Sequence, residues 1–186
     1  KFPMKDLETY NKDGSEMLGL LSSKVPGVVT STGAAGHGLP IAVGIAKAKK
    51  MKGEKGKVYC LMSDGEQQCG TTWEGAMFAA HHKLDNLVVI VDQNGWQATG
   101  KPKDVLNIEP LFFKYRSFGW QVKEIDGHNF EEIEKELNRP NNTSALNCFE
   151  RFSMMQKTEP LGCYCLSFTI GPKIIIAKTI KGKGVS

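Results

Sequence analysis

The chain has 186 residues, a formal net charge of +4, 40% hydrophobic residues and 24% charged residues. These values are ordinary for a globular protein, so we expect one domain with one sizeable core. No apolar run reaches the roughly 18–20 residues that cross a bilayer, and nothing resembles a signal peptide, so we expect no membrane span. The first residue is Lys, not Met, which suggests a processed chain or a fragment.

The lysines and cysteines narrow the classes of partner and compartment. Lysines cluster in Lys47–Lys57 and Lys178–Lys183, but neither cluster has interleaved aromatic residues or a known motif. A solvated surface is therefore a better interpretation than a nucleic-acid interface. The five cysteines are an odd number without a secretory signal, which favours reduced thiols and a cytoplasmic location.

Beyond residue 35, helix-like and strand-like segments alternate along the chain. The periodicity predicts helices at Leu39–Lys50, Thr71–Lys83, Glu109–Phe118 and Phe130–Leu137. Apolar runs predict strands at Lys57–Met62, Leu87–Val91, Gln121–Ile125 and Lys173–Lys178. The alternation favours an α/β fold, with a doubly wound, mainly parallel sheet and helices on both faces.

Side-chain spacing predicts local features of three of these helices. In the first, the apolar residues that recur at helical spacing are Ile41, Ile45 and Ala48. Its other positions include the small residues Ala42, Gly44 and Ala46, which would let another backbone approach closely. In the second, one face carries Trp73, Met77 and Ala80. The helix at 130–137 has Asn129 as its expected N-cap, with Glu132 completing a capping box.

Two stretches carry weaker signals. Residues 1–30 show little periodicity, and residues 138–172 begin with the turn-rich Asn138–Asn142 and lack a clean period. A loop of this length is uncommon inside a compact domain, so we expect 138–172 to be an atypical insertion or a flexible segment.

Two polar clusters follow buried strands at their carboxyl ends. Asp64 lies in the cluster Ser63–Gly65, and Asn94 lies 30 positions later in Asp92–Gly95. In an open parallel sheet, ligands bind beyond these strand ends. One carboxylate and one amide oxygen suit Mg²⁺, which usually takes phosphate oxygens and water as its other ligands. The alternative is that both are ordinary turn residues, because Asp-Gly and Asn-Gly are frequent turn dipeptides; their joint position favours the metal site.

The same clusters are similar to a family fingerprint. Asp64-Gly65-Glu66, followed by Asp92-Gln93-Asn94-Gly95, resembles the thiamine-diphosphate motif. Matching segments surround it, namely Ser31–Leu39, Trp73–Met77, Lys83–Leu87, Asp126–His128 and Ala177–Thr179. Together they resemble the amino-terminal half of transketolase, particularly the type in which that half is a separate polypeptide. The resemblance runs from about residue 31 to 137 and returns at 173–186.

The resemblance implies a single thiamine-diphosphate-binding domain over residues 1–186, truncated at its N-terminus. It also implies the ligands of the cofactor's diphosphate end. Asp64, the side chain of Asn94 and the backbone carbonyl of Trp96 would bind Mg²⁺. Gly65 would contact the diphosphate, with Glu66, Asn94 and Trp96 also at the cofactor. The glycine would let the backbone come close to a phosphate.

The resemblance further implies contacts to the rest of the cofactor and to substrate. The loop of Gly36, His37, Gly38 and Leu39 would lie against the aminopyrimidine ring. His128 would stand near the diphosphate and the substrate, where an imidazole donates a hydrogen bond or moves a proton. His37 and His128 are the expected catalytic histidines, although the family often has Gln at the position of His37.

The implied activity is the transfer of a two-carbon ketol unit from a ketose phosphate to an aldose phosphate, as in the pentose phosphate pathway. The chemistry would belong to thiamine diphosphate. Its activation needs a glutamate from the pyrimidine-binding half of the enzyme, and no segment here resembles that half. We therefore expect a carboxyl-terminal partner subunit in a homodimer or heterotetramer.

Several positions depart from the family pattern. Ser63 replaces the usual first Gly of the fingerprint, and Cys69 replaces a Glu that links two active sites, whereas Glu74 of that network is retained. The amino-terminal segment that carries a substrate-site histidine in the family is absent. These departures keep two alternatives open: a degenerate, non-catalytic binding protein, and another thiamine-diphosphate enzyme such as deoxyxylulose-phosphate synthase.

Overall fold

Four parallel strands form the central sheet, in the order β1-β2-β4-β3. The computed structural model describes residues 3–20, 22–141 and 170–183. The strands are β1 (Val58–Ser63), β2 (Leu87–Gln93), β3 (Gln121–Asp126) and β4 (Lys173–Lys178). The helices are η1 (Met4–Thr9), α1 (Gly38–Met51), η2 (Gly65–Gln68), α2 (Gly70–His81), α3 (Pro102–Val105), α4 (Leu111–Ser117) and α5 (Phe130–Asn138).

The two inner strands form because their residues are apolar and β-branched on both faces. In β2, the four fully buried residues are Leu87, Val88, Val89 and Val91. In β4, the buried isoleucines are Ile174, Ile175 and Ile176. Such continuous apolar runs are typical of strands that are covered on both sides. The predicted buried strands are therefore confirmed.

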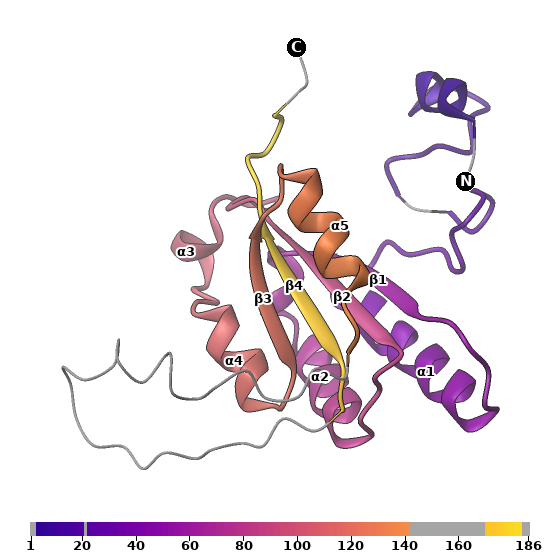
Figure 1. Cartoon of the computed structure of the whole chain (residues 1–186). Helices are drawn as coiled ribbons and strands as arrows, with labels where there is room; N and C mark the ends of the chain where they lie inside the picture. The colour runs from indigo at the N-terminus through magenta and orange to yellow at the C-terminus, as the bar shows by residue number, and fades with distance from the viewer. Residues whose placement is uncertain (1–2, 21, 142–169, 184–186) are drawn as a thin grey trace.

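Helices cover both faces of the sheet (Figure 1). On one face, α1, α2 and α4 contribute Leu39, Ala76 and Tyr115 to the main core, together with Met62 and Ile174 from the strands. On the other face, α5 packs the partly buried Ile133 and Leu137 against a smaller cluster of Val88, Ile125, Ile175 and Ala177. The doubly wound α/β prediction is confirmed, with every strand pair parallel.

Small residues form much of the buried faces of α1 and α2, as the sequence predicted for Ala42 and Ala46 of α1. The larger residues Ile41 and Met77 are exposed, whereas the small Ala42 and Ala46 of α1 and the residues Thr72, Gly75, Ala76 and Ala79 of α2 are buried. The two helices pack closely, because a Cβ at Gly75 would lie 3.3 Å from Leu39 Cγ. Small side chains are what this close packing requires.

Most element ends shift by one or two residues from the prediction, and η1, η2 and the four-residue α3 were not predicted. The N-cap prediction is confirmed, because Asn129 Oδ1 accepts hydrogen bonds from the backbone N–H groups of Glu131 and Glu132. The reciprocal half of the capping box differs. The Glu132 carboxylate accepts from Asp126 N and from the Asn129 side-chain amide.

The predicted insertion at 138–172 lies largely outside the described residues, which stop at Asn141 and resume at Ile170. Both described ends bind Gln121, at the start of β3. Its side-chain amide donates to Asn141 O, and its backbone N–H donates to Pro172 O at 3.0 Å. Across the described part of the chain, no helix has both the length and the apolar character of a membrane span.

Candidate cofactor and metal site

The sheet topology brings the two predicted clusters together. β1 and β2 are neighbours, with Ser63 opposite Asp92 in the register. The next residue, Asp64, lies at the start of η2 and is only 1% exposed. Its Oδ2 accepts a hydrogen bond of 2.8 Å from the backbone N–H of Gly95. The predicted convergence of the two strand tips is thus observed directly.

The second oxygen of Asp64 has no hydrogen-bond partner among the described residues. Asp64 Oδ1 is buried and accepts no hydrogen bond within the described part of the chain. Burial raises the pKa of Asp64, and the nearby charge of Asp92 raises it further, although the N–H groups of Gly95 and Gly65 oppose both effects. A buried carboxylate oxygen without a partner is costly unless a ligand or an ion satisfies it. This oxygen therefore fits a cation ligand.

The turn after β2 orients the amide of Asn94. The Asn94 Nδ2 donates to Asp92 Oδ2 at 2.9 Å, and its Oδ1 accepts from the backbone N–H of Trp96 at 2.9 Å. Gly95 takes a positive φ of 74°, which lets the chain turn back toward Asp64. The described residues hold no group of three or more His, Cys, Asp and Glu side chains fit for a metal ion. A cation here would therefore need amide and backbone oxygens beside Asp64.

The predicted pyrimidine loop is fixed against the tip of β1. The Glu66 carboxylate accepts from Gly36 N at 3.1 Å and from Ser63 N at 3.0 Å. Thr71 Oγ1 donates to Gly36 O at 2.8 Å. Gly36 has φ of 78°, and a Cβ there would lie 2.4 Å from the Cβ of Cys69. Only glycine fits this position, so the loop conformation is built into the fold.

Within that loop, the side chains point in different directions. Leu39 is fully buried and belongs to the core, so only its backbone is available to a ligand. His37 precedes α1 and is exposed, with Nδ1 3.0 Å from Ala35 O. Gly65, at the β1 tip, faces Gln97, whose Cβ would lie 3.0 Å from a Cβ at this glycine. The sequence did not single out Gln97.

The structure does not place His128 beside Asp64 and Asn94. His128 follows β3, which β4 separates from β2. Two strand spacings correspond to about 10 Å. Its Nε2 lies 2.9 Å from the backbone N–H of Ile180, which can only donate. Nε2 therefore accepts this hydrogen bond.

Two polar residues at the strand tips were missed as site residues. Asp92 binds the Asn94 amide through one carboxylate oxygen and the hydroxyl of Thr179 through the other. The spacing of Asp92 and Asn94 was the available signal, because residues two apart in an extended segment point to the same side. Thr179 gave no such signal, since its contact with Asp92 spans 87 residues.

Comparison with known proteins supplies the family. Residues 1–147 match the family model described as transketolase, thiamine diphosphate binding domain. The chain belongs to the transketolase family. The resemblance noted in the sequence is thus confirmed, as is the expectation of a thiamine diphosphate binding domain. The magnesium ion and the individual site residues remain predictions.

Transketolase relatives match most of this chain. It is 47% identical over 132 residues to a transketolase family protein of Sinorhizobium fredii, covering 70% of this chain and 47% of the relative. It is 38% identical over 181 residues to an apulose-4-phosphate transketolase subunit of Actinobacillus succinogenes, covering 97% and 56%. The chain spans about half the length of these curated relatives. The solved transketolase of Campylobacter jejuni superposes with a TM-score of 0.71 and 30% identity, over 97% of this chain and 26% of that one.

Proposed function

We propose that this chain is the thiamine-diphosphate- and Mg²⁺-binding part of a transketolase-type enzyme, which transfers a two-carbon ketol unit from a ketose to an aldose phosphate. One observation carries the proposal. In a member of this family, one oxygen of the buried Asp64 carboxylate has no partner in the part of the chain that the structure describes. It lies at the tip of β1, beside the turn that follows β2. A hard cation with a diphosphate would complete that oxygen's coordination.

The residues at the strand tips fit such a group. Asp64 Oδ1, Asn94 Oδ1 and the backbone carbonyl of Trp96 would hold Mg²⁺, giving one negative charge from the protein. This leaves room for the negative oxygens of a diphosphate, which a second carboxylate ligand would repel. Gly65, without a side chain, would expose its backbone N–H to the diphosphate.

The loop of Gly36–Leu39 would present backbone groups to the pyrimidine ring. Glu66 would act indirectly, since its carboxylate already accepts from the N–H groups of Gly36 and Ser63 and so holds the loop to β1. We propose His37, exposed at the start of α1, as the side chain of this loop that contacts the ligand.

When bound, thiamine diphosphate supplies the nucleophilic carbon that cleaves the C2–C3 bond of the ketose and carries the two-carbon fragment. His128 would serve substrate as a hydrogen-bond donor through Nδ1. Its Nε2 already accepts the Ile180 N–H, which fixes the orientation of the ring.

Turnover would require a second chain. We propose a pyrimidine-binding, carboxyl-terminal subunit that supplies the activating glutamate, in a homodimer or heterotetramer in the cytoplasm. Three similar proteins are named as transketolase subunits, which fits an enzyme divided between two chains. Their names point to different sugars, an apulose 4-phosphate for two and a 6-deoxy-6-sulfo-D-fructose for the third. A substrate panel should therefore include both phosphorylated and sulfonated ketoses, besides those of the pentose phosphate pathway.

Calorimetry tests the proposal. Thiamine diphosphate titrated into the full chain with Mg²⁺ should release heat, and titration with excess EDTA should release none. The same titration is repeated with a pyrimidine-binding subunit present. Absence of Mg²⁺-dependent heat under both conditions would refute the proposal. With the partner present, turnover of ketose phosphates but not pyruvate would favour transketolase over a deoxyxylulose-phosphate synthase.

A non-catalytic role is the second candidate, and Cys69 is the observation that favours it. Cys69 is half-buried against Gly36, at a position where the family typically has a Glu that links two active sites. We would compare Cys69→Glu with Cys69→Gln, which has the same size but no charge, in the presence of the partner. A large gain in turnover for Glu alone would favour lost catalysis; equal rates for both variants and the wild type would count against it.

A further inference from the structure

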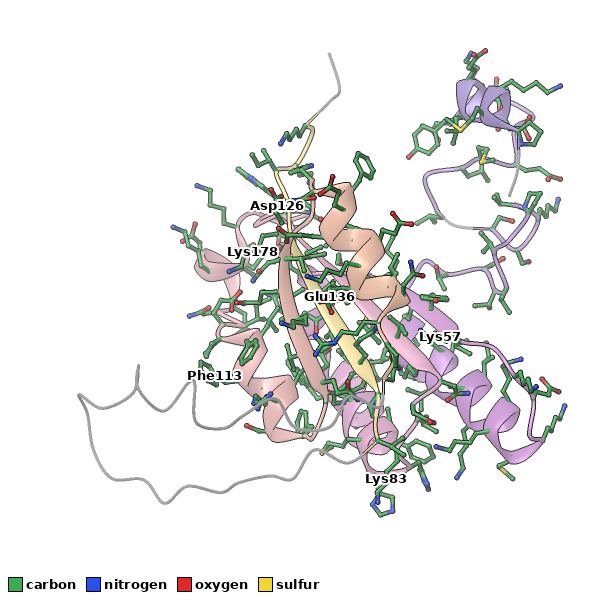
Figure 2. The ribbon with its side chains drawn as sticks, in the orientation of Figure 1. Lys57, Lys83, Phe113, Asp126, Glu136 and Lys178 are labelled. Atoms are coloured by element: carbon green, nitrogen blue, oxygen red, sulfur yellow. The ribbon has the colours of Figure 1, made fainter. Side chains whose placement is uncertain are left out.

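The segment that follows β4 joins three strand tips. Thr179 N donates to Gln93 O, at the end of β2, at 3.2 Å. On the other side, Gly127 N donates to Lys178 O at 2.8 Å, and Ile180 N donates to His128 Nε2 at 2.9 Å. Figure 2 shows Asp126 and Lys178 together at this end of β3 and β4, where the register pairs them. Residues 178–180 therefore contact both flanking strand ends.

The Thr179 side chain is held on both of its branches. Its hydroxyl donates to Asp92 Oδ1. Its methyl group packs on Gly127, where a Cβ would lie only 2.4 Å from Thr179 Cγ2. A β-branched side chain with both branches engaged has a single χ1 rotamer available. The hydroxyl is thus directed at Asp92 by packing as well as by its own hydrogen bond.

Asp92, held by Thr179, in turn binds the side-chain amide of Asn94. With Oδ1 engaged by Thr179, its Oδ2 accepts the Asn94 Nδ2 at 2.9 Å. An amide has a donor end and an acceptor end, and a carboxylate on one side decides which end faces it. Asn94 turns its nitrogen toward Asp92, while its Oδ1, on the other side of the amide, accepts the Trp96 N–H at 2.9 Å. A flipped amide would present an NH₂ group to a cation.

We infer that Thr179 and Asp92 are positioning residues for the cation site, and that they fix the Asn94 amide with its oxygen directed toward the ion. This inference rests on the proposed function. The same contacts place a hydrogen bond on each oxygen of Asp92, whereas Asp64 Oδ1 has none among the described residues. Residues behind the metal ligands typically change metal affinity by about 10–100-fold when they are removed.

A matched pair of variants separates the hydroxyl from the packing. Thr179→Val keeps the shape and loses the hydroxyl, whereas Thr179→Ser keeps the hydroxyl. In ¹⁵N spectra of the full chain without cofactor, the Asn94 side-chain amide should show a hydrogen-bonded, slowly exchanging proton in wild type and Thr179→Ser. This signature should be lost in Thr179→Val. An unchanged Asn94 signal in Thr179→Val, or its loss in Thr179→Ser as well, would overturn the inference.

Calorimetry with Mg²⁺ and thiamine diphosphate gives the functional readout. Thr179→Val should bind the cofactor at least about tenfold more weakly than wild type, with Thr179→Ser close to wild type. Asp92→Ala should match Thr179→Val, and the double variant should lose little more, because both act through Asn94. If Thr179→Val does not fold, Asp92→Ala takes its place, and the Asn94 amide spectrum and the cofactor affinity are measured for it.

The two proposals fail differently. If the wild type binds no cofactor with Mg²⁺, the proposed function fails, and the Asn94 spectra still decide whether Thr179 and Asp92 orient this amide. If the wild type binds and Thr179→Val binds equally well, the positioning inference alone is wrong.

Discussion

Asp64 and Gly95 lie 31 residues apart and are joined by a hydrogen bond of 2.8 Å from Gly95 N to Asp64 Oδ2. This bond holds the turn after β2 against the tip of β1. It also uses only one of the two carboxylate oxygens, and the other is buried with no partner in residues 3–20, 22–141 and 170–183. The residue proposed to bind the metal is therefore one that costs stability until a cation arrives.

Asp64→Asn should separate the cost of the buried carboxylate in the chain without cofactor from its contribution to metal binding. The amide has nearly the same shape and no charge to desolvate, so the variant without cofactor should be at least as stable as wild type. With Mg²⁺ and thiamine diphosphate at 100 times the dissociation constant, wild type should gain about 2.7 kcal/mol, and the variant nothing. Thermal unfolding with and without the ligands measures both, with the exposed Asp104→Asn as control. A variant that keeps the ligand-induced gain would show that Asp64 does not bind the metal.

Gly36→Ala should disrupt the pyrimidine loop. A side chain at positive φ costs about 1–2 kcal/mol. At Gly36 the new Cβ also meets Cys69 Cβ at 2.4 Å, which adds about 1–3 kcal/mol. The matched control is Gly53→Ala, with φ of 66° and no atom within 4 Å of the new Cβ. Urea unfolding measures the unfolding free energy that each variant loses, and the difference between the two losses is the contribution of the contact with Cys69. Equal losses would mean that Gly36 is not closely packed.

Lys173 should give the wild type a distinct pH dependence. The residue is 2% exposed, and its ammonium donates to the carbonyls of Glu136 and Arg139 at the end of α5. Burial, and then the nearby charge of Lys57, lower the pKa of Lys173 to about 8 from 10.5. Between these two values the unfolded chain holds a proton that the folded chain has released, so stability rises with pH in this window.

The measurement is the difference in unfolding free energy between wild type and Lys173→Met, at about pH 7 and about pH 9.5. The difference should shift in favour of wild type at the higher pH, because Met does not titrate. The remaining lysines are common to both proteins and cancel. A constant difference, or a shift toward the variant, would contradict a lowered pKa for Lys173.

Replacement of residues 142–169 by a short Gly-Ser linker should leave the domain folded. Both described ends of this stretch bind Gln121, and Asn141 also donates to Leu87 O at 3.2 Å, at the start of β2. These anchors lie at the amino ends of the strands, opposite the strand tips that carry Asp64. Loop closure changes slowly with length, so we expect a change of about 1 kcal/mol or less and unaltered cofactor affinity. A large loss of unfolding free energy or of cofactor affinity would show that the stretch supports the site.

The sequence was sufficient for the strands and for the meeting of the clusters Ser63–Gly65 and Asp92–Gly95 at neighbouring strand ends. Both follow from local patterns, because a buried parallel strand is a continuous apolar run and its tip is marked by turn residues. The inner faces of α1 and α2 could not be predicted from the larger residues. These helices pack through small ones, and periodicity within one helix does not reveal how closely its neighbour approaches.

The place of His128 depended on strand order, which local patterns do not encode. β4 comes last along the chain yet pairs with both β2 and β3, so it separates the tip of β3 from that of β2. The same position of β4 next to β2 brings Thr179 to Asp92, a contact that spans 87 residues. The position of β4 between β2 and β3 thus sets both the distance of His128 from the tip of β2 and the contact of Thr179 with Asp92.

A crystal structure of the chain grown with Mg²⁺ and thiamine diphosphate tests the central claim most directly. The account predicts a single Mg²⁺ about 2.0–2.1 Å from Asp64 Oδ1 and from Asn94 Oδ1, with diphosphate oxygens and water completing an octahedron. A diphosphate bound away from the tips of β1 and β2, or a cation held by Asp92 instead of Asp64, would contradict it.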